Sequence, residues 1–268
     1  MARSLLDRLA APALLLGLLL LWQVYVWTAH PPEFILPGPI VIAQTFVDIL
    51  PALIRHTTVT VVAGGLGFVA GSVIGLVLAV VMSLVPPVRS AIYPIIIGSQ
   101  TTPKIAFAPL LLVWFGIGLL PKVIIVALLA FFPVLINTLV GLDTTDRGFT
   151  ELLRSVDAGR WESYRKVRLP ASIPFIFAGL KLALTVSVIG AIIAEWVASN
   201  EGLGFLLLFY NATLRTPELF AVLVALVLLT SVAFGILVLI ERVFSWEARL
   251  NAGSTTAVRT SAAGEANL

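Results

Sequence analysis

The stretch "ELLRSVDAGRWESYRKVRLP", residues 151–170, is a compact charged segment in an otherwise apolar chain. It holds eight of the 31 charged side chains (17 Lys and Arg plus 14 Asp and Glu) in the 268-residue sequence. The whole chain is 59% hydrophobic and 12% charged, with a mean hydropathy of +1.07. Because soluble domains carry about 25% charged residues, this composition predicts a polytopic membrane protein with one structured polar loop.

The charged segment predicts two short helices. Glu151 and Arg154 are three residues apart and can pair on the surface of the first helix. Asp157 can cap the second helix, and Gly159 relaxes the backbone at the break between the two. The segment therefore has more local order than a plain connection between two spans requires.

The second short helix has an apolar stripe, because Trp161, Tyr164 and Val167 recur every three residues. An amphipathic helix of this kind docks into a groove of a partner protein, whereas an ordinary charge run is only solvated. The caps and ion pairs favour docking over a plain connector. The polar contacts expected beside the stripe are Arg160, Arg165 and Lys166, and the helix ends at Leu169 and Pro170.

Six apolar stretches are long enough to cross a membrane as helices of about 20 residues, and no stretch has the pattern of a β-strand. They are residues 10–28, 57–84, 91–120, 123–142, 174–198 and 219–243, and the third is expected to be broken by Pro94, Pro103 and Pro109. Pro174 suits the first turn of the fifth. The expected fold is all-α: one membrane domain over residues 1–250, with about six transmembrane helices, a helical cytoplasmic loop at 147–170 between spans four and five, and a disordered tail at 251–268.

The basic start and apolar run of the N-terminus resemble a signal peptide. The run is 18 residues long and no A-x-A cleavage site follows it, so we expect an uncleaved first span. Orientation follows from the Lys and Arg residues of the loops. With a cytoplasmic N-terminus, twelve basic residues lie inside and only Arg55, Lys122 and Arg215 lie outside, which places both termini and the charged loop in the cytoplasm.

The residue inventory excludes several kinds of chemistry. There is no cysteine, which excludes disulfides, thiolate nucleophiles and iron–sulfur ligation. His30 and His56 lie in one polar loop by this interpretation, so metal chemistry is not expected. The net charge of +3 implies no nucleic-acid surface. No Gly-Lys dipeptide occurs, hence no phosphate-binding loop, and we expect no ATP or other cofactor on this chain.

Polar residues inside spans are the best sequence indicators of a translocation pathway, because each costs free energy unless it faces protein or water. For Lys104 the sequence favours a pathway role and snorkelling to the cytoplasmic edge of the membrane equally. Glu195, beside Trp196, is more typical of an interfacial anchor, and Asn137 of a bond to a neighbouring helix. The candidate pathway residues are Gln100, Thr101, Lys104, Asn137, Ser187 and Glu195.

Two series of small residues predict close helix contacts. They are Gly67, Gly71 and Gly75 in the second span and Ala183, Ser187 and Ala191 in the fifth. The sequence leaves open whether they join spans of one chain or of two copies.

Three other functional classes fit less well. A secondary carrier needs buried coupling carboxylates or half-repeats, and we expect only Glu195 to be available, with no half-repeat in the sequence. A membrane hydrolase needs a Ser–His pair, paired Asp or a zinc site at depth. A channel subunit would leave the charged loop unexplained.

The charged loop resembles the EAA loop of permease subunits of ATP-binding-cassette (ABC) importers. That motif has Glu-Ala-Ala, three residues, Gly, nine residues and Ile-x-Leu-Pro. Here Glu151 matches the Glu and Leu169-Pro170 match the Leu-Pro, while Leu152-Leu153 replace the Ala pair, Asp157 the Gly and Val167 the Ile. The flanking blocks "SQTTPKIAFAPLLLVWFGIGLLPK" and "IIAEWVASNEGLGFLL" resemble the nitrate, sulfonate and taurine permease group, most of all its branch for the pyrimidine precursor of thiamine.

The resemblance implies a division of labour. ATP and Mg would bind to a separate ATPase subunit, which contacts the second helix of the charged loop and rocks the spans between inward and outward access. The working unit would contain two permease chains, as a homodimer, in the lipid of a bacterial inner membrane. An external binding protein would deliver an inorganic anion, a sulfonate or a pyrimidine precursor.

Overall fold

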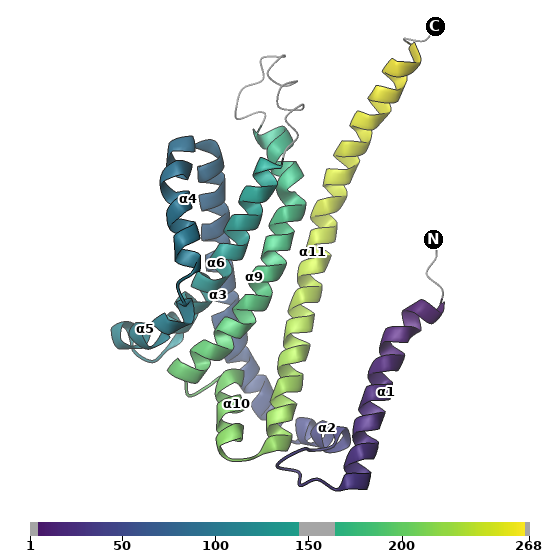
Figure 1. Cartoon of the computed structure of the whole chain (residues 1–268), viewed down its shortest axis with the longest axis vertical. Coiled ribbons are helices and arrows are strands. Elements are labelled where there is room, and N and C mark those ends of the chain that lie inside the picture. Colours follow the sequence, from purple (N-terminus) through teal and green to yellow (C-terminus); the bar gives the residue numbers. More distant parts are fainter. Residues whose placement is uncertain (1–4, 145–163, 266–268) are drawn as a thin grey trace. The chain divides into compact units, whose positions relative to one another are not determined.

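A computed structural model describes residues 5–144 and 164–265, and every regular element within these ranges is helical (Figure 1). The long helices are α1 (Leu5–Ala29), α3 (Leu50–Leu84), α6 (Leu119–Asp143), α9 (Leu169–Ala198) and α11 (Thr216–Glu265). The shorter elements are α2 (Pro39–Asp48), α4 (Pro86–Gln100), the 3-10 turn η1 (Lys104–Phe107), α5 (Ala108–Phe115), the π-helical turn η2 (Tyr164–Arg168) and α10 (Leu203–Ala212).

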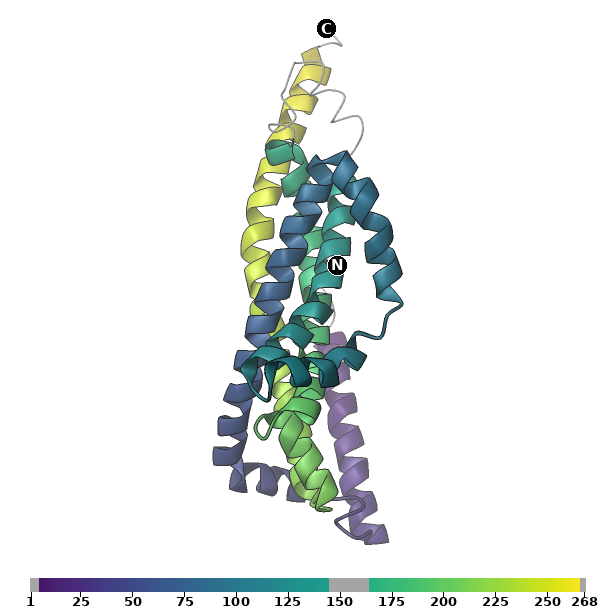
Figure 2. The same ribbon diagram turned by 90° about the vertical axis from the view of Figure 1, so that its left-hand side faces the viewer.

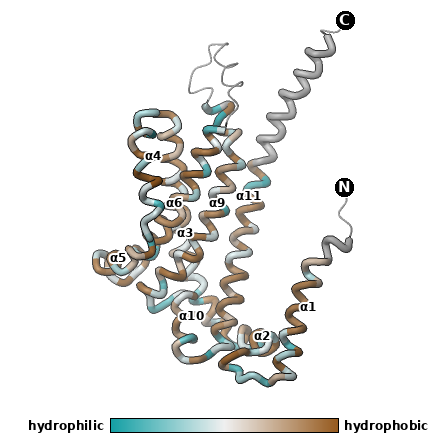
Figure 3. The backbone as a smooth tube through the Cα atoms, in the orientation of Figure 1, coloured by the Kyte–Doolittle hydropathy of each residue, from teal (hydrophilic) through white to brown (hydrophobic). Residues whose placement is uncertain are grey.

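Five helices are long and apolar enough to cross a membrane, and a sixth span results if α4, η1 and α5 are taken together. The five stretches are Ala10–Ala29, Leu50–Leu84, Leu119–Asp143, Leu169–Val197 and Thr216–Phe244. Hydrophobic residues predominate along α1, α6 and α9 (Figure 3). The predicted class, an all-α polytopic membrane protein with about six spans, is confirmed.

The stretch predicted as a third span, residues 91–120, is broken as its prolines predicted, but only at Pro103, because Pro94 lies inside α4 and Pro109 in the first turn of α5. Two pieces, Pro86–Gln100 and Lys104–Phe115, meet at an angle of 87°. Figure 2 shows α5 lying crosswise to α4. Pro103 explains the break, because its ring removes a backbone donor and disfavours helical geometry at the preceding Thr102.

Two helix ends differ from the sequence expectation. α9 begins at Leu169, so Pro170 takes the place in the first turn that was expected for Pro174, which lies inside the helix. α11 continues to Glu265, across most of the stretch where a disordered tail was expected. The residues of this extension include no proline and several alanines, the strongest helix former.

The chain divides into two compact units: Met1–Val61 with Ser199–Leu229, and Val62–Ala198 with Thr230–Leu268. In the first unit, side-chain contacts join segments that are distant in sequence. The Gln23 side chain accepts a hydrogen bond from the Ile40 backbone N–H at 3.1 Å, and Thr216 Oγ1 donates to the Phe34 carbonyl at 2.6 Å. The Trp22 ring lies 5.7 Å from that of Phe220.

The start of α10 in the first unit is capped by side chains of α3. Gly202 precedes α10 with φ of 113°, a conformation that favours glycine. Its N–H donates to His56 Nδ1, and the Leu203 N–H donates to Thr60 Oγ1, both at 2.9 Å. His56 therefore lies in the second turn of α3, not in a loop as expected, and it satisfies a donor that α10 cannot satisfy itself.

Close packing of α6 on α9 forms the centre of the second unit, where the two helices lie side by side (Figures 1 and 2). A Cβ at Gly179 would lie 2.9 Å from both the Pro133 carbonyl oxygen and the Asn137 Cβ, so there is no room for a side chain. Ala183 is fully buried and packs in one cluster with Ala130 and Val134 of α6. Small residues thus let the two helix backbones approach closely.

The glycine series of α3 faces α6 within the same chain. A Cβ at Gly67 would lie 2.5 Å from Val126 Cβ, and one at Gly75 would lie 2.7 Å from the Phe131 carbonyl oxygen. A Cβ at Gly71 would meet the backbone of Ala127. The question left open by the sequence is therefore answered for this series, which joins two helices of one chain.

We predict that Gly71→Ala destabilises the protein by about 1–3 kcal/mol, because the added methyl group meets helix backbone that cannot move aside. Gly65→Ala is the matched control, since nothing lies within 4 Å of a Cβ at that position. Thermal unfolding in mild detergent measures both. Equal melting temperatures for the two variants would contradict the proposed α3–α6 contact.

Candidate translocation site

The break between α4 and η1 brings polar residues together inside an apolar chain. Gln100, Thr101 and Thr102 are exposed there, ahead of Pro103. The Thr101 hydroxyl donates to the Gly98 carbonyl at 2.8 Å, and the Ala106 N–H donates to the Pro103 carbonyl at 2.9 Å. The two helical pieces therefore end in local hydrogen bonds on either side of the break.

The depth of the break follows from the length of α4. Its 15 residues extend about 22 Å at about 1.5 Å per residue. A hydrocarbon core is about 30 Å thick, so a helix that starts at one interface carries the break to membrane depth. Non-helical backbone at that depth is tolerated only where protein or water covers it.

Lys104 begins η1 directly after the break. Its ammonium nitrogen lies 4.2 Å from the centre of the Phe132 ring, a cation–π contact. Phe132 lies near the middle of α6, so Lys104 is beside the central part of that helix and not beside either end. This geometry fits the pathway interpretation of Lys104 better than snorkelling at the membrane edge.

Asn137 was expected to bond to a neighbouring helix, but its described side-chain hydrogen bond is to its own helix. Its side-chain amide donates to the Pro133 carbonyl at 2.8 Å. The side chain is half-buried and its Cβ lies against Gly179 of α9. The described contacts of Asn137 therefore belong to the packing of α6 and α9.

The two candidates on α9 are buried, unlike the exposed residues at the break. Ser187 is 2% exposed and Glu195 is completely buried, whereas the adjacent Trp196 is 48% exposed. Trp196 thus has the exposure expected of an interfacial anchor, and Glu195 is enclosed by protein. Of the six predicted pathway residues, the structure gathers three at the break: Gln100, Thr101 and Lys104.

The expected ATPase-contacting residues fall partly outside the described residues. Those that do are Glu151, Arg154, Asp157, Gly159, Arg160 and Trp161. Tyr164, Arg165 and Lys166 form η2, which leads directly into α9 at Leu169 and Pro170. Tyr164 is 3% exposed while Arg165 is exposed, and burial raises the pKa of the Tyr164 hydroxyl, an effect that nearby Arg168 partly offsets.

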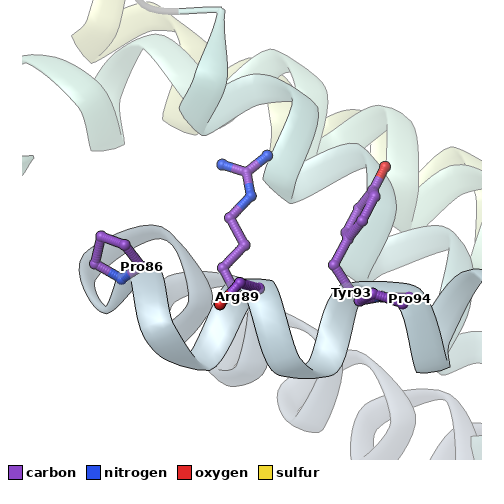
Figure 4. A pocket seen from close by; sticks show the side chains of 5 residues that line it. Pro86, Arg89, Tyr93 and Pro94 are labelled. Atoms are coloured by element: carbon purple, nitrogen blue, oxygen red, sulfur yellow. The ribbon is translucent and has the colours of Figure 1, made fainter.

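A charge pair fixes the end of α6 just before the charged loop. Arg89 of α4 donates two hydrogen bonds to Asp143, at 2.8 and 2.6 Å, and its guanidinium lies 5.9 Å from the Tyr93 ring centre. Arg89 and Tyr93 project from one side of α4 in a shallow groove of about 320 Å³ that Pro86 and Pro94 also line (Figure 4). Both charged side chains are about 40% exposed, so the pair contributes about 0–1 kcal/mol.

Sequence reasoning missed a second charge pair, within the spans. Lys181 Nζ of α9 lies 2.5 Å from Glu241 Oε2 of α11, with side-chain exposures of 28% and 23%. Glu195 is therefore not the only carboxylate within a span. The signal was one basic and one acidic residue in two different apolar stretches, a combination that predicts pairing at membrane depth.

Known proteins resemble this chain along most of its length. It is 36% identical over 221 residues to a probable ABC transporter permease protein of Haemophilus influenzae, covering 82% of this chain and 90% of the relative. A riboflavin transport system permease protein of Chloroflexus aurantiacus is 35% identical, covering 90% and 91% of the two chains. A formylaminopyrimidine transport permease protein of Halalkalibacterium halodurans is 32% identical, covering 85% and 91%.

The family model for the inner membrane component of binding-protein-dependent transport systems matches residues 71–245, from the glycine face of α3 to the membrane part of α11. This range contains the polar break and the whole charged loop. The chain thus belongs to the binding-protein-dependent transport system inner membrane components, and it is a transmembrane permease subunit of an ABC importer.

Proposed function

We propose that two copies of this chain form the membrane part of an importer in a bacterial inner membrane. Separate ATPase subunits bind ATP and Mg on the cytoplasmic side, and an external binding protein delivers the solute. Family membership supports the subunit composition, and the sequence, which has no Gly-Lys dipeptide, supports placing ATP hydrolysis on another chain. The excess of Lys and Arg in the inner loops supports cytoplasmic termini.

The polar break at Gln100, Thr101 and Lys104 is the single observation that carries the proposed pathway. Irregular backbone with exposed polar side chains is unfavourable against lipid tails, and the same groups are favourable beside water. We therefore place the pathway along this break, with the second permease chain on its other side. Alternating access would open the break to one side of the membrane and then to the other.

The charged loop supplies the link to the ATPase in this proposal. Tyr164 is buried within the chain itself and Arg165 is exposed, so in η2 the Arg165 side chain, and not Tyr164, is available to a partner. Because η2 continues into α9, a displacement of the loop would be passed directly to a transmembrane helix. Trp161 would then be the apolar anchor in the ATPase groove, while Tyr164, which was also expected to be an anchor, holds η2 against its own chain.

The proposed solute is a small nitrogen heterocycle of the pyrimidine type. Two of the relatives described above are named for riboflavin and formylaminopyrimidine, both of which contain such rings. The break combines neutral hydrogen-bonding groups with aromatic surface: Gln100 and Thr101 supply the first, and the exposed Phe107 supplies the second. Lys104 could also attract an inorganic anion or a sulfonate, the alternative that the resemblance includes.

The pathway can be tested by thiol labelling, because the natural chain has no cysteine. We predict that Thr101→Cys reacts with a water-soluble maleimide in membrane vesicles, since a thiol needs water to form the reactive thiolate. Val73→Cys is the control, as an exposed apolar position on α3 in the same unit. The pathway placement fails if Thr101→Cys is no more reactive than Val73→Cys.

ATPase coupling can be tested by co-purification from the native host. We predict that Trp161→Asp releases the ATPase while leaving the permease folded in the membrane, whereas Trp161→Phe retains it, because a charge in an apolar docking groove is costly and an aromatic ring is not. Quantitative mass spectrometry of the tagged permease measures the ratio. Retention of the ATPase by Trp161→Asp would argue against this docking site.

Uptake assays distinguish the two solute classes. In vesicles with the assembled importer and its binding protein, we predict that unlabelled formylaminopyrimidine or riboflavin competes with the transported solute, and that taurine and nitrate do not. Lys104→Met should then keep substantial uptake, because no anionic group on the solute needs its charge. If taurine or nitrate competes and the heterocycles do not, the importer belongs to the anion class.

A further inference from the structure

We infer that Lys181 and Glu241 are a positioning pair that keeps α9 and α11 together while the permease changes conformation. The inference rests on the proposed function, since it concerns which helices move as one body during transport. The two side chains meet at 2.5 Å and lie in the stretches Leu169–Val197 and Thr216–Phe244, both apolar enough to cross the membrane. Neither residue was expected to have a role from the sequence.

The environment makes separation of this pair costly. Both side chains are about three-quarters covered within the chain, and both lie in stretches apolar enough to cross a membrane. A single charge at membrane depth is unfavourable, and removing one partner of a covered pair leaves the other uncompensated. If α9 and α11 moved apart during transport, both charges would lose their partner in every cycle.

A second contact lies one helical turn from the ion pair. The Phe177 and Phe244 rings are 6.0 Å apart, and Phe177 is 7% exposed. Phe177 and Lys181 are four residues apart on α9, and Glu241 and Phe244 are three residues apart on α11, so each helix presents both contacts on one side. The α9–α11 contact therefore combines an ion pair with aromatic packing.

The same part of α9 is also packed against α6. A Cβ at Gly141 of α6 would lie 2.7 Å from Phe175 Cβ and 3.1 Å from Ser172 Cβ, and Gly179 of α9 fits against Asn137. This part of α9 thus contacts α6 through small residues and α11 through Phe177 and Lys181. Because α9 directly follows η2, motion of the charged loop would move these parts of the three helices together.

A thermal double-mutant cycle tests the pair. We expect Lys181→Met alone and Glu241→Leu alone each to lower the apparent Tm by roughly 5 °C, because each leaves one covered charge unpaired. The double variant should regain most of the lost Tm. The exchange Lys181→Glu with Glu241→Lys, which restores a pair of opposite charges, should retain uptake. Additive losses in the double variant would overturn the inference, since they would show that the two residues do not interact.

Cross-linking tests whether the two helices stay together. Lys181→Cys with Glu241→Cys, in the natural cysteine-free chain, can be joined by a short reducible bis-methanethiosulfonate linker. We expect the linked protein to retain ATP-driven uptake, because the linker replaces a contact that persists through the cycle. Uptake that stops on linking and returns on reduction would overturn the inference. The two single-cysteine variants, treated with the same reagent, control for modification alone.

The experiment separates this inference from the proposed function. ATPase co-purification and ATP-driven uptake of the unchanged protein are measured in parallel. If the unchanged protein binds no ATPase and takes up no solute with the ATPase and binding protein present, the proposed function fails, while the thermal cycle still reports on the ion pair. If the unchanged protein transports and the linked protein does not, only the inference fails.

Discussion

Pairing of backbone N–H and C=O groups is the constraint on which the rest of this structure depends. In hydrocarbon no water is present to satisfy these groups, so each segment at membrane depth must satisfy them internally. The described chain meets this requirement with long helices such as α3, α6 and α9. The break before η1 is a departure from this rule within the apolar part, and its position follows from one proline and three polar neighbours. The proposed pathway follows this local departure from the constraint.

Close approach of helix backbones is the second requirement, because hydrophobic burial gives little drive for association between helices in lipid. Gly71 of α3 and Gly179 of α9 place α6 against two neighbours at distances that no larger residue allows. Charge pairs add specificity at other contacts: Arg89 with Asp143 joins α4 to α6, and Lys181 joins α9 to α11. Packing thus sets how close the helices lie, and the ion pairs help select which helices meet.

Composition and span length were sufficient to predict the helical membrane class, because both depend on local hydropathy alone. Breaks were expected at Pro94, Pro103 and Pro109, but which of these prolines ends a helix could not be predicted, since Pro94 and Pro133 lie inside continuous helices of the same chain. Whether a proline breaks a helix depends on whether neighbouring groups compensate for its missing donor, which is a tertiary property.

The candidate site was predicted only in part, for the same reason. Gln100, Thr101 and Lys104 were found because polar residues cluster there in sequence. Lys181 and Glu241 were missed because their contact joins residues sixty positions apart. Ser187 and Glu195 were proposed for the pathway from polarity alone, and their burial depends on packing that no local pattern encodes.

The bend between α4 and α5 has a mechanical consequence. The last bond of one piece is donated by the Thr102 N–H and the first of the other is accepted by the Pro103 carbonyl, so rotation about the Thr102–Pro103 backbone turns one piece against the other without breaking either bond. A kink inside a continuous helix must instead weaken several ladder bonds. The segment can therefore act as a hinge whose stiffness is set by two or three residues, with Pro103 restricting the angles that Thr102 can adopt. Its resistance to turning is then independent of how long or how stable the adjoining helices are.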